Sequence, residues 1–162
     1  MSVSDLAHLS ISRWLWRRLI GELYRRGQSR RESGAFLLGV CQGSRARVRD
    51  FICYDDLDPN ALNKGYVTLH SQGLKALWAQ CRARQLDVVA DVHTHPGLDT
   101  RQSDLDQRHP MIPVDGHIAL IVPNFANTTR WQLIGVGVHE YRETGWLQHA
   151  APQSRVQLSW WP

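Results

Sequence analysis

The sequence predicts a single α/β domain built on one mixed β-sheet, and three observations support this. The chain has 162 residues, the length of one compact domain with a full core. Its hydrophobic content of 43% and charged content of 21% are those of a globular protein, which excludes a disordered chain. Apolar runs of strand length alternate with segments whose apolar residues recur at helical spacing, which is typical of a sheet flanked by helices.

We expect residues 1–162 to form this one domain, with a core over about 11–147 and a C-terminal tail over 148–162. The net charge of +4 is modest and spread along the chain, so the charge gives no reason to expect nucleic-acid binding. The three cysteines are far apart and odd in number, which favours free thiols and a reducing compartment. No signal peptide or membrane-spanning segment is recognisable, so we expect a cytoplasmic protein with no membrane partner.

The N-terminal half is predicted to hold a helix followed by two strands. Residues 1–10 are polar and are expected to be loosely held, whereas apolar residues recur about every four positions over 11–26 and indicate an amphipathic helix. A continuous apolar run over 33–41 is typical of a buried strand, and the strand predicted over 46–54 should pair with it. We expect a loop over 55–65, which is rich in Asp, Pro, Asn and Gly, and then a short strand over 66–69.

The C-terminal half begins with a predicted central helix over 71–84, capped by Ser71, and a strand over 86–95. We expect a short helix from Ser103, next to residues that could bind a metal. The remaining elements are predicted to be strands over 117–122 and 131–138, a polar hairpin over 140–147, and a terminal strand or docking tail over 156–161. Trp160 and Trp161, at the end of that tail, would either pack on the body of the protein or contact a partner, and we expect packing on the body.

The strand predicted over 86–95 is apolar for most of its length and ends in two histidines, which can bind a metal. Val88, Ala90 and Val92 are expected to point one way, whereas His93 and His95 stand two residues apart and should share the opposite face. Two imidazoles and one carboxylate, that of Asp106, form a ligand set that suits Zn²⁺ and leaves a fourth position for water. Any of these residues alone would more often be structural, but together they predict a metal site.

At this point the sequence resembles the JAMM (MPN-plus, JAB-domain) zinc metalloproteases. The family pattern is a glutamate before a glycine-containing apolar strand, then H-[ST]-H-P, a serine separated from the second histidine by seven residues, and an aspartate three positions after that serine. Here Glu32 precedes the apolar run over 33–41, and His93-Thr94-His95-Pro96 is followed by Ser103 and Asp106. The pattern of strands and helices from about residue 32 to 138 fits as well, so the resemblance implies an MPN/JAB-type domain.

The resemblance implies a role for each matching residue. His93, His95 and Asp106 would hold one Zn²⁺ per chain, and Glu32 would act as general base. Ser103 would donate a hydrogen bond to the developing oxyanion, although a serine three residues before an acidic residue is also typical of a helix capping box. For Asp91, on the histidine face of the strand, we keep two interpretations: orienting a ligand ring, or a solvated or arginine-paired carboxylate.

Family members that keep all five residues resemble isopeptidases that cleave after the C-terminal Gly-Gly of ubiquitin or a ubiquitin-like protein. The short chain is similar to compact prokaryotic JAB proteins, whose partners include bacterial E1-, E2- and ubiquitin-like proteins, some from anti-phage operons. The expected substrate is therefore a ubiquitin-like protein, in a conjugate or as a precursor, and E1- and E2-like proteins are further expected partners. The alternatives are a non-catalytic MPN-type scaffold and a RadC-like protein with a DNA-related function.

Overall fold

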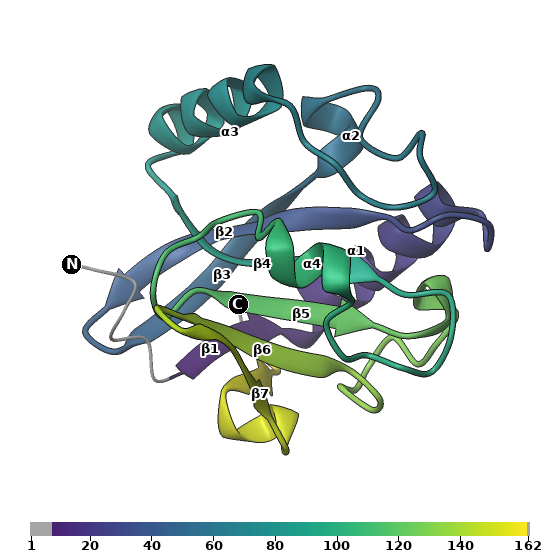
Figure 1. The fold of residues 1–162 in the computed structure, drawn as a ribbon. Coiled ribbons are helices and arrows are strands. Elements are labelled where there is room, and N and C mark those ends of the chain that lie inside the picture. The colour runs from purple at the N-terminus through teal and green to yellow at the C-terminus, as the bar shows by residue number, and fades with distance from the viewer. Residues whose placement is uncertain (1–7, 162) are drawn as a thin grey trace.

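The computed structural model describes residues 8–161, which form one mixed sheet flanked by helices, as the sequence predicts (Figure 1). The strands are β1 (His8–Ser12), β2 (Gly34–Gln42), β3 (Arg45–Cys53), β4 (Asp87–Thr94), β5 (Ile118–Val122), β6 (Gly137–Arg142), β7 (Gly145–His149) and β8 (Val156–Ser159). The helices are α1 (Arg13–Gly27), α2 (Tyr54–Leu57), α3 (Ser71–Arg84) and α4 (Asp104–Arg108), with 3₁₀ turns η2 (Asn124–Ala126) and η3 (Pro152–Ser154).

The eight strands lie in the order β7-β6-β5-β4-β2-β3-β1-β8. The central strand β4 pairs antiparallel with β2 and parallel with β5, so its carboxyl end is enclosed on both sides. β6 and β7 form an antiparallel hairpin at one edge, and β8 runs parallel to β1 at the other. A central strand with neighbours on both sides gives the side chains at its end a rigid support.

Each face of the sheet carries its own hydrophobic cluster. One face is covered by α1, which buries Trp16, Leu19, Ile20 and Leu23 against the sheet. The opposite face carries α2 and α3, whose buried residues include Tyr54, Leu77 and Cys81 (Figure 1). The spacing of the apolar residues in α1 explains its burial, because residues three and four apart share one face of a helix.

A bulge changes the predicted facing of β4. Leu37 pairs with Ala90 but the next residue, Leu38, pairs with Val88, so Val89 is an extra residue in the ladder. As a result Val88 packs in the cluster under α3, while Ala90 and Val92 pack in the cluster under α1. The prediction that Val88 shares a face with Ala90 and Val92 is therefore wrong, although the alternation beyond the bulge holds.

The first helix begins two residues later than predicted, because Ile11 and Ser12 belong to β1. The Ser12 hydroxyl accepts a hydrogen bond from the Leu15 N–H at 3.2 Å and caps the helix. Residues 8–10, predicted to be loose, also lie in β1, whereas residues 1–7 fall outside the described part of the chain. The helix ends at Gly27, close to the predicted stop.

Three further predictions about loops need correction. Residues 55–57 lie in the single turn α2, and residues 66–69 are no strand, because this segment turns back so that the Thr68 N–H donates to the Ala61 carbonyl at 2.9 Å. Most of the strand predicted over 131–138 is loop, since Gly135 has a φ of +75° and β6 begins only at Gly137.

Helix α3 has the predicted bounds, but His70 occupies its cap position instead of Ser71.

The C-terminal segment forms both the hairpin and the terminal strand that the sequence predicts. The polar hairpin predicted over 140–147 is formed by β6 and β7 and extends to His149, and β8 adds an edge strand. Trp160 and Trp161 are 63% and 82% exposed, so the expected packing on the body is limited to the Arg13 guanidinium, which lies 4.9 Å from the centroid of the Trp160 ring. All three cysteines are free, and no helix in residues 8–161 is long and apolar enough to cross a membrane.

Candidate metal centre

His93 and His95 lie at the carboxyl end of β4, and both are buried. β4 alternates its side chains, so the two rings point to the same side. Their Nε2 atoms are 3.1 Å apart. Two buried ring nitrogens this close, both aimed at one point, are the arrangement of ligands around a shared cation and are unfavourable for two imidazolium rings.

Asp106 is brought to these histidines by the short helix α4. Ser103 caps this helix through a capping box: its hydroxyl accepts from the Asp106 N–H at 3.1 Å, and the Asp106 carboxylate accepts from the Ser103 N–H at 2.9 Å. This reciprocal pair fixes the first turn, so the Asp106 side chain faces the end of β4. The capping box predicted from the sequence is therefore present, and it orients a candidate ligand.

The three donor groups fit a zinc ion. The His93 Nε2 lies 3.4 Å from Asp106 Oδ1, and the His95 Nε2 lies 3.2 Å from Asp106 Oδ2. With Zn–N and Zn–O bonds of about 2.0–2.1 Å, ligand atoms in a tetrahedral site stand about 3.3 Å apart. The separations between these side chains match that value, and all their ligand atoms lie within 4.8 Å of one another.

The backbone selects the tautomer of His95. Its Nδ1 lies 2.9 Å from the carbonyl oxygen of Asp99. A carbonyl oxygen only accepts, so Nδ1 carries the proton and the Nε2 of the neutral ring presents its lone pair to the cluster. The loop after β4 thus holds one candidate ligand ring with its Nε2 turned toward the cluster.

Glu32 stands beside this cluster at the start of β2. Its N–H donates to the Gly65 carbonyl at 2.9 Å, and its carboxylate accepts a hydrogen bond from the Val67 backbone N–H. Burial raises the pKa of Glu32, and the charges of His93 and His95 oppose this rise. A carboxylate with a raised pKa, facing a metal site, has the character of a group that takes up and returns a proton.

Contacts between β2 and β4 hold Glu32 in place. The Ser33 N–H donates to Thr94 Oγ1 at 3.0 Å, and the Thr94 N–H donates to the Ser33 carbonyl at 2.9 Å. Gly34 pairs directly with His93, and a Cβ at this glycine would lie 2.4 Å from the Tyr54 ring. Only glycine lets the two strands approach here, which explains the glycine within the apolar run.

The electrostatics of the cluster favour an ionised Asp106. Burial alone would raise the pKa of Asp106, but hydrogen bonds and charges from His93 and His95, with the Ser103 hydroxyl, hold it well below its usual range. Burial lowers the pKa of His95, but its bonds to Asp106 and to the Asp99 carbonyl outweigh burial and leave the pKa raised. The carboxylate is therefore charged and available as a ligand.

Ser103 lies where the sequence predicts a group near the reacting carbonyl. Its hydroxyl donates to Asp106 Oδ2 at 2.7 Å, and the side chain lines the open cleft beside His95. The hydroxyl is thus engaged with the ligand carboxylate and sits at the cleft wall at the same time. The predicted helix cap is therefore present, and the hydroxyl lies at the cleft wall, where its role toward a substrate stays a prediction.

Asp91 fits neither of its two sequence interpretations. It is 3% exposed, and its carboxylate oxygen lies 2.7 Å from the Nε2 of the equally buried His117, so it is neither solvated nor paired with an arginine. No bond from Asp91 to a ligand ring is among the contacts of the described residues. The Asp91–His117 pair forms a polar support in the interior behind the site.

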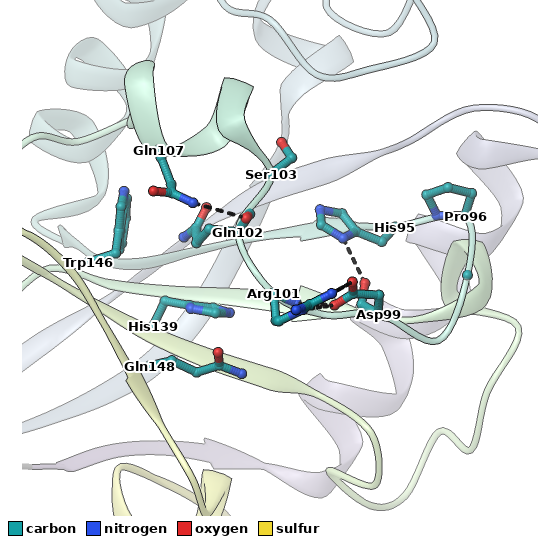
Figure 2. A pocket seen from close by; sticks show the side chains of 11 residues that line it. His95, Pro96, Asp99, Arg101, Gln102, Ser103, Gln107, His139, Trp146 and Gln148 are labelled. Atoms are coloured by element: carbon teal, nitrogen blue, oxygen red, sulfur yellow. Dashed lines mark hydrogen bonds and ion pairs between the residues drawn. The ribbon is translucent and has the colours of Figure 1, made fainter.

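The structure adds residues that sequence reasoning missed. His139, on β6, is buried near His93 and His95, and its Nε2 donates to the Thr100 carbonyl at 2.7 Å. Trp146, on β7, lines the cleft of about 510 Å³ that opens at His95 and Ser103 (Figure 2). Side chains alternate between the two faces along β6, so a strand predicted with the correct bounds would have put His139 on the face of the site. The sequence instead predicts a strand over 131–138, which ends before His139.

Comparison with known proteins agrees with this fold. A family model described as prokaryotic homologs of the JAB domain matches residues 17–134. A solution structure of a protein from Desulfitobacterium hafniense is similar, with a TM-score of 0.65 and 15% sequence identity over 93% of this chain and 92% of that one. A second, from Salinibacter ruber, has a TM-score of 0.60 and 16% identity over 86% and 88% of the two chains. At these identities the two structures support the fold alone.

Proposed function

Because the chain belongs to the family of prokaryotic homologs of the JAB domain, we propose that it is a zinc-dependent isopeptidase or peptidase acting on a ubiquitin-like protein. The bond cut is the amide that follows the C-terminal Gly-Gly of the modifier, in a conjugate or a precursor. The observation that carries this proposal is the convergence of His93, His95 and Asp106 at ligand spacing. Glu32 adds a carboxylate of raised pKa beside these three residues.

The residues of this chain have separate roles in the proposed amide hydrolysis. A zinc ion bound by the cluster would lower the pKa of a water molecule towards about 7 and polarise the scissile carbonyl. Glu32 accepts the proton of the attacking water and delivers it to the departing amine, for which its raised pKa is suited. The Ser103 hydroxyl turns from Asp106 Oδ2 to the carbonyl oxygen of the substrate as negative charge develops there.

A second cleft, on the other side of α4, suits the tail of the modifier. Its volume is about 720 Å³, and its lining is largely apolar, with Lys64 and Arg108 among its polar members. The apolar lining residues come from the segment around Val67, from α3 and α4, from the chain after α4 and from β6: Tyr66, Val67, Leu69, Leu74, Leu105, Pro110, Met111, Pro113 and Tyr141. An extended tail entering here passes the Glu32–Val67 contact before it reaches the ligands, and two small glycines fit so crowded a place.

We place this activity in a bacterial system that conjugates a ubiquitin-like protein, with E1- and E2-like proteins as further partners and anti-phage defence as one setting. The non-catalytic scaffold is the less favoured reading of the same fold. A scaffold has no need for an ionised carboxylate and two histidines whose donor atoms converge without an arginine or lysine among them. The substitution at Glu32 described next separates the two readings.

The decisive experiment follows cleavage of a Gly-Gly-linked fusion of a candidate ubiquitin-like protein by the zinc-loaded chain. We expect Glu32→Gln to retain one zinc and to lose about 10²–10⁴-fold in rate, because the general base is removed while the ligands remain. Glu22→Gln, which changes a glutamate on α1, is the matched control and should cut at the wild-type rate. Equal rates for Glu32→Gln and wild type, or full activity after chelation of the zinc, would contradict the proposal.

A further inference from the structure

The strand β8 lies at one edge of the sheet, and β2, β3 and β1 separate it from β4 and the candidate metal site. It pairs with β1 on its inner side, and no other strand within residues 8–161 pairs with its outer side. Val156–Ser159 include no charged residue and no proline, and their register with β1 has no bulge. Charges, prolines and bulges commonly protect a free edge, so β8 is open to pairing with a further strand.

A cleft of about 590 Å³ follows this free edge. Val156, Gln157 and Leu158 all line it, although the side chains of consecutive strand residues point to opposite faces of a sheet. The cleft therefore runs along the edge of the strand, where the backbone groups are, and not over one face alone. Its facing wall is formed by residues 132–134 of the loop before β6. We call this cleft the β8 groove.

The groove is apolar on the side of α1. Val156 is buried in the hydrophobic cluster under α1, Leu158 packs against that cluster, and Leu133 of the facing wall is buried in it as well. Leu158 is only partly buried, however, and Ile134 is 64% exposed. A strand that adds to β8 with apolar residues at alternate positions would cover both of these side chains.

Positive charge stands beside the groove without a balancing carboxylate. The guanidinium of Arg13, which lines the groove, lies 4.9 Å from the Trp160 ring centroid and donates to the Trp131 carbonyl. The guanidinium of the exposed Arg17 lies 5.3 Å from the Trp131 ring centroid. These contacts are to neutral groups, and in the part of the chain that the structure describes no carboxylate lies within ion-pair distance of either arginine. Aromatic contacts position the two charges and leave them uncompensated.

The edge, the lining and the charge together identify the class of partner. A free strand edge pairs with backbone N–H and carbonyl groups, which a polypeptide has and a nucleic acid lacks. The two arginines favour carboxylates on that polypeptide. A second copy of this chain is disfavoured, because its net charge of +4 would bring further positive charge to the groove.

We propose that the β8 groove binds an extended segment of a partner protein, which adds to β8 as a further strand of the sheet. Its alternate apolar side chains pack against Leu158 and Ile134, and a carboxylate of the segment pairs with Arg13 or Arg17. This interaction goes beyond the proposed peptidase function, because the groove shares no lining residue with the clefts beside the metal centre. Binding therefore requires neither zinc nor Glu32.

The test is an NMR titration of the full chain with an acetylated and amidated heptapeptide of sequence DVTVTVD, which alternates apolar residues and ends in carboxylates. The backbone N–H signals of β8 should shift, saturate and exchange more slowly with solvent. Those of β7, at the opposite edge of the sheet, should do neither. The lysine peptide KVTVTVK should bind about tenfold more weakly, because it repels the two arginines.

Substitution of the arginines tests the charge term. The preference for the acidic peptide should fall to about two- to threefold in Arg17→Gln, whose exposed side chain has no part in the core, and likewise in Arg13→Gln. Arg82→Gln, which removes the same charge from an exposed position of α3, is the matched control and should keep the full preference.

Four results would overturn the proposal. They are β8 signals that the acidic peptide does not move, equal binding of both peptides by wild type, and an equal preference in Arg17→Gln and Arg82→Gln. The fourth is a peptide-free dimer in light scattering whose β8 amides are already protected, which would assign the groove to a second copy. Octathymidylate that moves the β8 signals where the peptide does not would assign it to nucleic acid. Zinc binding and fusion cleavage are measured separately, so none of these results bears on the peptidase.

Discussion

Two carboxylates of this protein, the partly buried Asp106 and the buried Glu140, both contact histidines, yet their surroundings differ in one decisive way. Glu140 is bonded to His149 at 2.8 Å and also to the guanidinium groups of Arg142 and Arg155, at 2.6 and 3.0 Å. Asp106 meets histidines and the Ser103 hydroxyl, with no arginine or lysine within ion-pair distance among the described residues. Permanent positive charge therefore balances the first carboxylate and is missing around the second.

This difference distinguishes a structural ion-pair cluster, that of Glu140, from a candidate metal site, that of Asp106. A buried carboxylate is stable when charged partners replace its water, and Glu140 has two that cannot lose their protons. Asp106 instead shares its space with two ring nitrogens 3.1 Å apart, one of which presents a lone pair. Two ring nitrogens and a carboxylate that converge on one point form a ligand set suited to a cation, so the Asp106 cluster is the candidate metal site.

The largest effect that separates the clusters concerns stability. Glu140→Gln should lower the free energy of unfolding by about 2 kcal/mol, because the buried Glu140 side chain loses its charge-assisted hydrogen bonds to the partly exposed Arg142 and Arg155. Zinc binding by the folded protein should be unchanged. Urea denaturation with an unaltered slope measures this, and Glu143→Gln, at the neighbouring exposed turn, should stay within about 0.5 kcal/mol of wild type. An equal loss in both variants would remove the structural role of Glu140.

A smaller effect comes from a third carboxylate–histidine pair, Asp58 with His70. The His70 ring, with the N–H groups of Asn60 and His70, holds the pKa of Asp58 below its ordinary value. This stabilisation is present above the unfolded pKa of about 3.9 and is lost as pH falls through the lower folded value. Since the His70 ring is 61% exposed, we expect Asp58→Asn to cost less than about 1 kcal/mol at pH 7.

Denaturation of wild type and Asp58→Asn at several pH values checks this. The difference between the two should shrink as the pH falls below about 4, because protonated Asp58 no longer attracts its donors. A difference that stays constant down to pH 2 would mean that Asp58 acts through packing and hydrogen-bond geometry. In that case only Asp106 and Glu140 would remain to be compared as charged groups.

Much of the candidate site could be predicted because its residues are close in sequence. The spacing from His93 to Asp106 is set by one strand end, one loop and one capping box, all of which have local signatures. Glu32 was found only through the family pattern, since its approach to the histidines depends on the pairing of β2 with β4. Long-range pairing of this kind leaves no local signal.

The residues that sequence reasoning missed depend on strands from the far end of the chain. His139 and Trp146 reach the site through the β6–β7 hairpin, whose first strand was placed too early in an apolar segment that forms a loop. Glu140 meets Arg155 because the chain after η3 returns beside it. Trp160 follows the last residue of the edge strand β8, and its ring contacts the Arg13 guanidinium of α1 but remains largely exposed.

The central claim, that the Asp106 cluster is a metal site and the Glu140 cluster is not, is tested most directly by calorimetric titration of the chelator-treated chain with Zn²⁺. We predict one zinc per wild-type chain, an affinity at least about 100-fold lower for Asp106→Asn, and wild-type binding for folded Glu140→Gln. A wild-type chain that binds no zinc, or an Asp106→Asn chain that binds it as wild type does, would contradict the account.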